Sequence, residues 1–202
     1  MATHGTDAYA GIDDGLPPLV RDALAAARTS AFPHSCRPEQ GRLLHALAGG
    51  APARIGETGT GLGVGLAWLA SGARPGVQLY SVERDPDRGR AAAGVFADRP
   101  CVTVLTGDWR RIEEYGPFDL LVLDGGGQGK APGDRPADVE RLLAPGGTVV
   151  VDDFTPATGR LPLHEGVPDA ARLHWLEHPA LRATELRLAP GLSTVVGTRL
   201  LV

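Results

Sequence analysis

The chain has 202 residues, of which 43% are hydrophobic and 22% charged, and its formal net charge at pH 7 is -4. This length and composition indicate one globular domain with a single buried core. The acidic balance argues against a nucleic-acid partner, no apolar run is long enough to cross a membrane, and two cysteines make neither a disulfide framework nor a zinc motif.

The N-terminal part is predicted to precede the sheet. Residues 1–15 are rich in small and polar residues, which predicts a flexible tail; they do not resemble a signal peptide, which favours a cytoplasmic protein. Helices are predicted over 19–28 and 37–47. Residues 16–202 are expected to form one domain, in which the helices of 16–50 either cap the substrate or make a homodimer contact.

From residue 54 onward, segments with strand character alternate with helical ones. The predicted strands cover residues 54–57, 77–82, 101–105, 118–123 and 148–151. The predicted helices between them cover 63–70, 85–97 and 134–143, with a short helical turn over 108–114. This alternation implies right-handed crossovers and a parallel sheet covered on both faces, hence an α/β fold.

The C-terminal part departs from this alternation. A helix is predicted over 168–178, and strands are predicted over 181–188 and 193–201. The four residues between the two strands are too few for a parallel crossover. The strands are therefore predicted to form an antiparallel hairpin.

A glycine-rich turn follows the first predicted strand, with glycines at every second position from 59 to 65. Glycine permits positive φ and lets a ligand approach the backbone. The N-terminus of the next helix favours an anionic group. Glu57, Gly59, Thr60, Gly61 and Gly63 are therefore predicted to bind a nucleoside cofactor.

Glu83 ends the second predicted strand, with Arg84 beside it. A carboxylate in this position can accept hydrogen bonds from both hydroxyls of a ribose. Dinucleotide-binding folds use the same arrangement, so Glu83 supports a nucleoside without choosing its class.

The turn from Glu57 to Gly63 reads acidic-x-Gly-x-Gly-x-Gly, and it fails the dinucleotide pattern G-x-G-x-x-G because positions 64 and 66 are Val64 and Leu66. It resembles the first motif of class I S-adenosylmethionine-dependent methyltransferases. The resemblance implies a Rossmann-like, doubly wound, mostly parallel seven-stranded sheet with an antiparallel terminal hairpin. It also implies S-adenosylmethionine as the cofactor, and it argues against the alternative of an NAD-dependent oxidoreductase.

The end of the third predicted strand carries Gly107, Asp108 and Trp109. The methyltransferase resemblance places Asp108 beside the adenine amino group and Glu57 near the methionine end. Trp109 either covers the adenine ring or belongs to the core.

Asp124 follows the strand 118–123, and Asp152 and Asp153 follow the strand 148–151. Ligands of open α/β sheets bind at the carboxyl ends of strands. Carboxylates that converge there repel one another, and a hard divalent ion such as Mg²⁺ would relieve this. The trio resembles the metal ligands of catechol and caffeoyl-CoA type O-methyltransferases. The resemblance implies metal-assisted methyl transfer to a phenol- or catechol-like hydroxyl of a small molecule.

The expected catalytic residues are Asp124, Lys130 and His34. The catechol type carries a lysine three residues after the first aspartate, where this chain has Gly127, and Lys130 is its only lysine. His34 and His164 are loop residues that could act as the base. Two alternatives stay open: a metal-independent methyltransferase acting on N, C or O of a small metabolite, and a non-catalytic S-adenosylmethionine- or nucleotide-binding protein.

Overall fold

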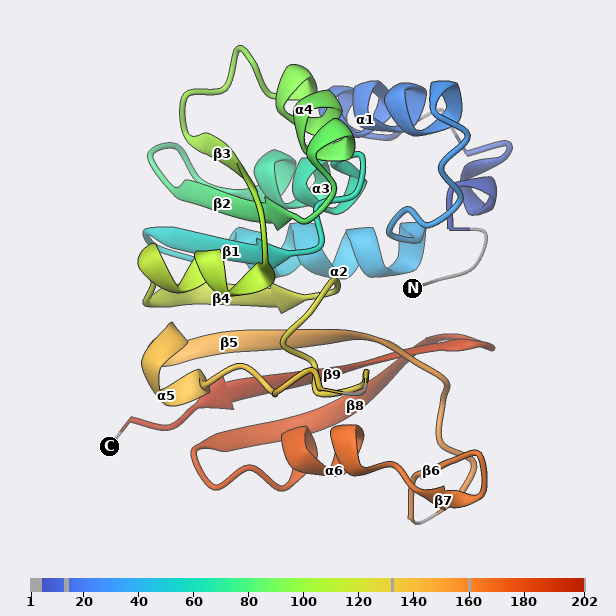
Figure 1. Ribbon diagram of the computed structural model, residues 1–202, viewed down its shortest axis with the longest axis vertical. Coiled ribbons are helices and arrows are strands. Elements are labelled where there is room, and N and C mark those ends of the chain that lie inside the picture. Colours follow the sequence, from blue (N-terminus) through green and yellow to red (C-terminus); the bar gives the residue numbers. More distant parts are fainter. Residues whose placement is uncertain (1–4, 13–14, 132, 160, 202) are drawn as a thin grey trace.

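The computed structural model describes residues 5–12, 15–131, 133–159 and 161–201. A seven-stranded sheet in the order β3-β2-β1-β4-β5-β9-β8 forms the centre of the protein (Figure 1). Strands β1 to β5 pair in parallel, and β9 runs antiparallel between β5 and β8. The predicted Rossmann-like sheet with its antiparallel hairpin is confirmed.

The strands of this sheet are β1 (Arg54–Thr58), β2 (Gln78–Glu83), β3 (Val102–Thr106), β4 (Phe118–Leu123), β5 (Leu143–Phe154), β8 (Leu181–Ala189) and β9 (Leu192–Arg199). The helices are α1 (Pro18–Thr29), α2 (Pro38–Ala48), α3 (Val64–Gly72), α4 (Pro86–Val95), α5 (Val139–Leu142) and α6 (Ala170–Leu176), with 3-10 helices η1 (Asp7–Tyr9) and η2 (Trp109–Glu114). A separate small hairpin, absent from the sequence prediction, pairs β6 (Leu163–His164) with β7 (Val167–Pro168). None of the described helices combines the length and apolar character needed to cross a bilayer.

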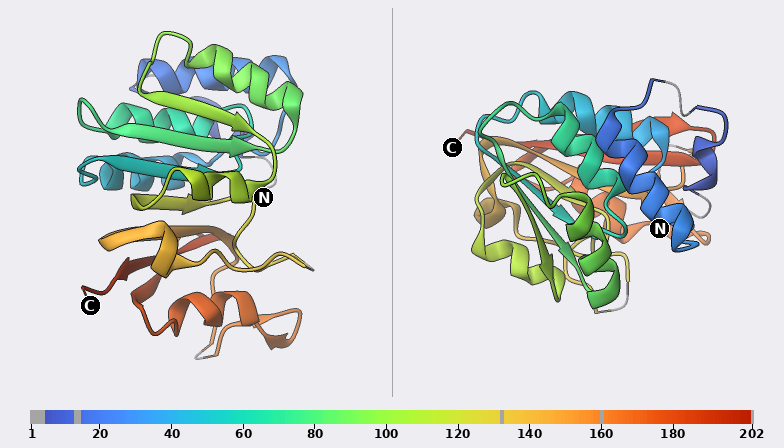
Figure 2. Two further views of the ribbon diagram at one scale, coloured as in Figure 1. Left: turned by 60° about the vertical axis from the view of Figure 1, so that its left-hand side comes forward. Right: turned by 90° about the horizontal axis from the view of Figure 1, so that it is seen from above.

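Helices cover both faces of the sheet, which explains the continuous apolar runs of its central strands (Figure 2). Along β4, Leu120 and Val122 pack into the core on the side of α1, α2 and α3. Leu121 and Leu123 pack into the core on the opposite side, with Trp175 of α6. Successive side chains alternate between the faces, so a strand buried on both sides must be apolar at every position.

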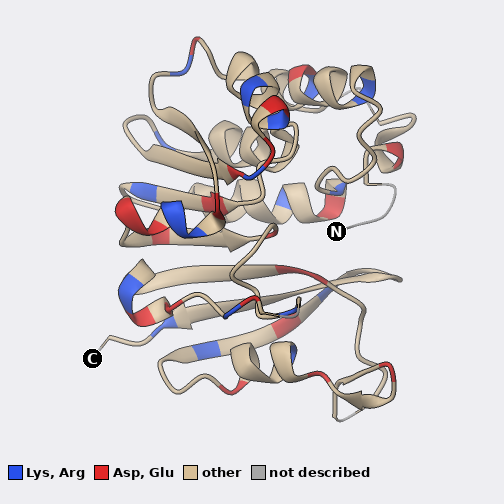
Figure 3. Cartoon of the chain, in the orientation of Figure 1, with Lys and Arg blue, Asp and Glu red and all other residues tan. Residues whose placement is uncertain are grey.

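The parallel strands end together at one edge of the sheet, and this edge positions the candidate site. The register pairs Thr58 with both Val82 and Leu123, and Leu123 with Val151. The residues that follow these positions are mostly acidic, and Figure 3 shows acidic residues at several strand ends along this edge. The parallel register therefore gathers carboxylates from separate strands.

The prediction of a flexible tail is wrong for residues 5–12. Tyr9 is completely buried; its hydroxyl donates to the carbonyl oxygen of Cys36 at 2.7 Å and accepts from Nε1 of Trp68 at 2.9 Å. Thr6 Oγ1 donates to the carbonyl oxygen of Phe32 at 2.6 Å. One buried aromatic with a satisfied hydroxyl anchors this otherwise polar segment. Residues 1–4 and 13–14 lie outside the described residues.

The helix predicted over 134–143 is reduced to α5. The carboxylate of Asp134 accepts from the backbone N–H groups of Gly127 and Gly129 at 3.0 and 2.9 Å. This ties the segment back onto the preceding glycine-rich loop. The helix begins only after Asp138, whose side chain accepts from two N–H groups of its first turn. Local side-chain bonds of Asp thus compete with helix formation here.

Candidate active site

A cavity at the carboxyl ends of β1, β2 and β4 brings most of the predicted cofactor residues together. Its walls are the glycine-rich turn 57–65, the loop 32–36 and the ends of β2 and β4. The predicted residues that line it are Glu57, Gly59, Thr60, Gly61, Glu83 and Asp124. Gly63 instead meets the core: its φ is 89°, and a Cβ there would lie 2.9 Å from the ring of Phe96.

Glu57 lies at the bottom of this cavity, buried within a polar network. Ser81 Oγ donates to Glu57 Oε2 at 2.5 Å and lies 2.6 Å from Thr60 Oγ1. Burial raises the pKa of Glu57 to about 8, against the opposing effect of the Ser81 hydrogen bond. A Cβ at Gly65 would lie 2.6 Å from Glu57 Oε1, so the glycine leaves room for the carboxylate. A buried carboxylate of this kind is suited to a cationic partner.

Glu83 is held in place by backbone and side-chain donors. Its Oε2 accepts from the N–H of Gly61 at 2.9 Å, and its Oε1 accepts from the N–H of Asp85 at 2.9 Å and from Arg88 Nη2 at 2.9 Å. Arg88 lines the cavity, whereas the predicted Arg84 is exposed and lies outside its lining. Side chains of a helix tilt toward its N-terminus, so Arg88 in the first turn of α4 reaches back to Glu83.

The loop 32–36 forms the wall opposite the glycine-rich turn, and the sequence carried no motif for it. A Cβ at Gly61 would lie 3.1 Å from the ring of Phe32. Burial raises the pKa of the Cys36 thiol, and the nearby aspartates add to this. His34 packs edge-on to Phe32, with ring centroids 5.6 Å apart, and lines the same cavity as Asp124. The structure thus places the predicted base His34 on the cofactor cavity.

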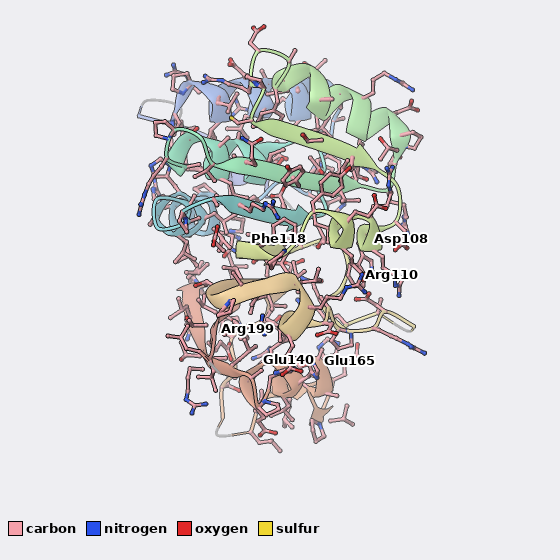
Figure 4. All side chains as sticks on the ribbon, turned by 90° about the vertical axis from the view of Figure 1, so that its left-hand side faces the viewer. Asp108, Arg110, Phe118, Glu140, Glu165 and Arg199 are labelled. Atoms are coloured by element: carbon pink, nitrogen blue, oxygen red, sulfur yellow. The ribbon has the colours of Figure 1, made fainter. Side chains whose placement is uncertain are left out.

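The residues predicted for the adenine lie outside the lining of this cavity. The carboxylate of Asp108 accepts from the backbone N–H of Arg110 at 3.0 Å and from its guanidinium at 3.2 Å (Figure 4). The Arg110 guanidinium lies 5.0 Å from the ring centroid of Trp109. The Trp109 ring also packs closely against Gly126, because a Cβ added at Gly126 would lie 2.5 Å from Cδ1 of Trp109. Adenine binding by Gly107, Asp108 and Trp109 therefore stays a prediction.

Asp152 near the end of β5 is buried, and Asp124, which follows β4, is half-buried. Burial raises the pKa of Asp124 to about 7, and the negative charge of Asp153 adds to the shift. Burial and the charge of Asp124 likewise raise the pKa of Asp152. The predicted repulsion among these carboxylates is therefore present, and a cation in their midst would relieve it.

The three aspartates nevertheless do not form a ready metal site, since the described residues contain no group of three or more side chains that could hold a metal ion. The register of β5 is irregular between Val151 and Phe154, where Asp153 has a φ of 71°. One oxygen of the Asp152 carboxylate, Oδ1, accepts from the N–H of Asp153 at 2.7 Å. The predicted ligand set of Asp124, Asp152 and Asp153 is not confirmed.

Lys130 reaches back from the glycine-rich loop to the end of β5. Its Nζ donates to the carbonyl oxygens of Asp152 and Asp153, at 2.9 Å for Asp153, and lies 3.8 Å from the ring centroid of Phe154. Gln128 Nε2 anchors the loop by donating to carbonyl oxygens at the ends of β4 and β5, at 2.8 and 3.0 Å. Burial lowers the pKa of Lys130, and the aspartates oppose this.

Comparison with known proteins identifies the family. Residues 57–154 match the model of a methyltransferase domain. A relative from Mycobacteroides abscessus that carries an O-methyltransferase name is 36% identical in an alignment of 176 positions, which covers 75% of this chain and 78% of the relative. A protein of Mycobacterium tuberculosis named catechol O-methyltransferase is 32% identical in an alignment of 188 positions, which covers 86% of this chain and 83% of the relative. The chain belongs to the S-adenosylmethionine-dependent O-methyltransferases.

Solved structures agree with this assignment. A cofactor-bound Mycobacterium tuberculosis protein has a TM-score of 0.74 and 27% identity, with 99% of both chains covered. An O-methyltransferase from Bacillus cereus in complex with S-adenosylhomocysteine (SAH) shares the fold, with a TM-score of 0.72, 21% identity and 98% of both chains covered. Membership of this family gives S-adenosylmethionine as the cofactor of the methyltransferase and excludes the NAD-dependent alternative.

A second cavity of the methyltransferase, of about 260 Å³, lies between the end of β5 and α6. Its lining includes Lys130, Asp153, Phe154, His164, Val167 and Pro168. The small hairpin of β6 and β7 supplies the last three, so His164, a second candidate base, belongs here. Arg172 in its wall is ion-paired with Asp169 at 3.2 Å and Glu185 at 3.1 Å. The lining thus combines apolar side chains with charged ones on both sides: Lys130 and Asp153 on one side, and the ion-paired Asp169 and Arg172 on the other.

Proposed function

We propose that this methyltransferase transfers the methyl group of S-adenosylmethionine to the hydroxyl oxygen of a small phenol- or catechol-like molecule. The observation that carries the proposal is the second cavity, which adjoins the carboxylates and offers an aromatic wall in Phe154 and a cation in Lys130. A flat hydroxylated ring suits such a cavity. The relative named catechol O-methyltransferase points to the same acceptor class.

The proposed chemistry is an in-line displacement. A lone pair of the acceptor oxygen forms the new bond to the methyl carbon while the S–C bond breaks with its electron pair left on sulfur. The products are SAH and a methyl ether, and the hydroxyl proton leaves to water. The protein supplies orientation and favours a deprotonated oxygen.

The cofactor contacts follow from the first cavity. Glu57, with its buried carboxylate, is proposed to pair with the methionine ammonium, and Glu83 to accept from the ribose hydroxyls. A carboxylate has about four lone-pair positions, and Arg88 with two backbone N–H groups already uses most of those of Glu83. The ribose therefore has to share Glu83 with Arg88 or displace it.

Assistance by a divalent ion is a second candidate, favoured by the raised pKa values of Asp124 and Asp152. Oxygen donors of this type suit Mg²⁺. The arrangement of the described aspartates does not match this chemistry, because they do not form a group of three ligands. No step of the proposed transfer is assigned to a metal.

A panel of acceptors tests the proposal. Purified protein is incubated with S-adenosylmethionine and matched phenols, catechols, anilines and thiols, with and without EDTA, and products are analysed by mass spectrometry. The expected result is methyl ethers from the hydroxylated acceptors. Methylation at nitrogen or carbon alone would favour the metal-independent alternative, and cofactor binding without any product would favour a non-catalytic protein.

A further inference from the structure

The two cavities share no lining residue, and the aspartates lie between them. Asp124 lines the cofactor cavity, whereas Asp153 and Lys130 line the second one. A methyl group that leaves the cofactor for an acceptor in the second cavity has to pass this boundary. The acceptor oxygen therefore belongs at the end of the cavity that Lys130 occupies.

Lys130 is a cation fixed in place at this boundary. It is the only lysine of a chain with 20 basic residues. An ammonium has three N–H donors, and two of those of Lys130 go to the carbonyl oxygens of Asp152 and Asp153. The ammonium lies over the ring of Phe154, and the Arg172 guanidinium also lies over this ring, 4.8 Å from its centroid. Neighbours that are themselves anchored thus set the position of the charge.

The same boundary lacks a ready set of metal ligands. The aspartates act on Lys130 through their charges, yet the described residues offer no group of three that could hold an ion. A metal ion that is chelated by the acceptor would require the acceptor to carry two vicinal oxygens. A single ammonium places no such requirement on the acceptor, because two of its three N–H donors are used by backbone carbonyls and the third can bond to one acceptor oxygen.

Resting on the proposed O-methylation, we propose that the Lys130 ammonium, and not a divalent ion, is the cation that faces the acceptor oxygen. The acceptor class is then an ionisable phenol that needs only one hydroxyl. In the reaction, the phenol proton passes to water, the phenolate lone pair forms the O–C bond, and the S–C bond breaks with its pair on sulfur. Lys130 keeps its proton and all its bonds throughout.

Nitrophenols test this directly, because their phenolate forms absorb visible light and are poor acceptors. 4-nitrophenol, with one hydroxyl, and 4-nitrocatechol, with two vicinal ones, are titrated into the full-length protein with saturating SAH and EDTA. A nearby cation lowers the pKa of a phenol by about one unit. At a fixed pH, this raises the ratio of phenolate to phenol about tenfold. We expect both probes to show this shift.

Three variants assign the effect. Lys130→Met keeps the length of the side chain without its charge and should abolish the shift, whereas Lys130→Arg should keep most of it. Val167→Trp should block the probes by filling the cavity, and its parent side chain is 60% exposed, so the fold tolerates the change. SAH affinity by calorimetry should stay unchanged in all three, which separates local effects on the acceptor site from misfolding. The melting temperature should stay unchanged in Val167→Trp and fall in Lys130→Met, which removes two hydrogen bonds to backbone carbonyls.

The proposal is overturned if the phenolate signal requires added Mg²⁺, if only 4-nitrocatechol gives it, or if Lys130→Met gives it as strongly as the parent protein. Unchanged probe binding in Val167→Trp would refute the location. If both probes bind as phenolates but no acceptor of the panel is methylated, the proposed function fails while the Lys130 site stands. If SAH binds and neither probe does, the acceptor site is wrong and the cofactor site is unaffected.

Discussion

The cofactor half and the acceptor half of the site lie at one edge of the sheet but are built differently. The cofactor half consists of strand ends and tight turns that touch directly: a Cβ at Gly59 would lie 2.5 Å from the Cα of Gly125. The acceptor half consists of Gly129 and Lys130 from the loop after β4, the end of β5, the start of α6, and the hairpin of β6 and β7, where Leu163 is 54% exposed. Backbone packing thus fixes the first half, whereas the second depends on a few side-chain anchors.

The largest effect is expected from Glu57→Gln. The change removes the buried charge proposed to pair with the methionine ammonium, and loss of one partner of a buried ion pair costs several kcal/mol. We expect SAH affinity to fall about 100-fold in calorimetry. Asp119→Asn is the matched control, because Asp119 bonds to the N–H groups of Ala53 and Arg54 at the opposite ends of the strands. An affinity within threefold of the parent for Glu57→Gln would refute the assigned role.

A smaller loss is expected from Gly65→Ala, which tests whether tight packing positions Glu57. The added Cβ would lie 2.6 Å from Glu57 Oε1, so the carboxylate has to move. About a tenfold loss of SAH affinity should follow, since one hydrogen-bonding geometry is disturbed without loss of charge. Gly94→Ala is the control: a Cβ there meets nothing within 4 Å, and the change should stabilise α4 by roughly 0.5–1 kcal/mol. Equal affinities of the two variants would contradict the packing argument.

The same contrast explains which parts of the site the sequence predicts. Glu57 and Glu83 lie at the ends of apolar strands and Asp124 follows another. Parallel strands end at one edge, so the convergence of these residues could be predicted from strand order alone. Arg88 was missed in favour of Arg84, since the tilt of side chains in a helix decides which arginine reaches back. The strand pattern thus predicts positions better than it predicts side-chain partners.

The places of residues in irregular segments could not be predicted from the sequence pattern. Phe32 and Cys36 reach the cofactor cavity because Tyr9 and Thr6 brace their loop, a long-range contact that no local motif announces. Asp134 reads as part of a helix, but its carboxylate binds the N–H groups of the glycine-rich loop instead. In both cases hydrogen bonds between side chains and backbone groups outside the segment override the local preference.

The pH dependence of stability probes the cofactor half without any ligand. Burial raises the pKa of Glu57 in the folded state to about 8, above the 4.5 of a solvated glutamate, so the folded state retains a proton that the unfolded state releases. The contribution of Glu57 to the free energy of unfolding is fully present below pH 4.5 and is lost as the pH rises through 8. Over this range the free energy of unfolding falls by at most about 1.4 kcal/mol per pH unit. Urea unfolding of the parent protein and Glu57→Gln between pH 5 and 9 should show a shallower decline in the variant. Parallel curves would contradict the raised pKa.

The smallest effect is expected at the edge of the acceptor half, from Leu163→Ser. Leu163 is 54% exposed and lies outside the lining of the second cavity, although its neighbour His164 belongs to that lining. Surface substitutions of this kind change stability by about 0.5 kcal/mol or less. We expect kcat/KM for a phenol to change by less than about threefold, with SAH affinity unchanged. Leu186→Ser on β8, 36% exposed in the parent protein, is the control outside the hairpin. A large loss of kcat/KM for Leu163→Ser alone would show that the hairpin contacts the acceptor more closely than the exposure of Leu163 implies. A parallel loss of SAH affinity would show that the two halves of the site are coupled.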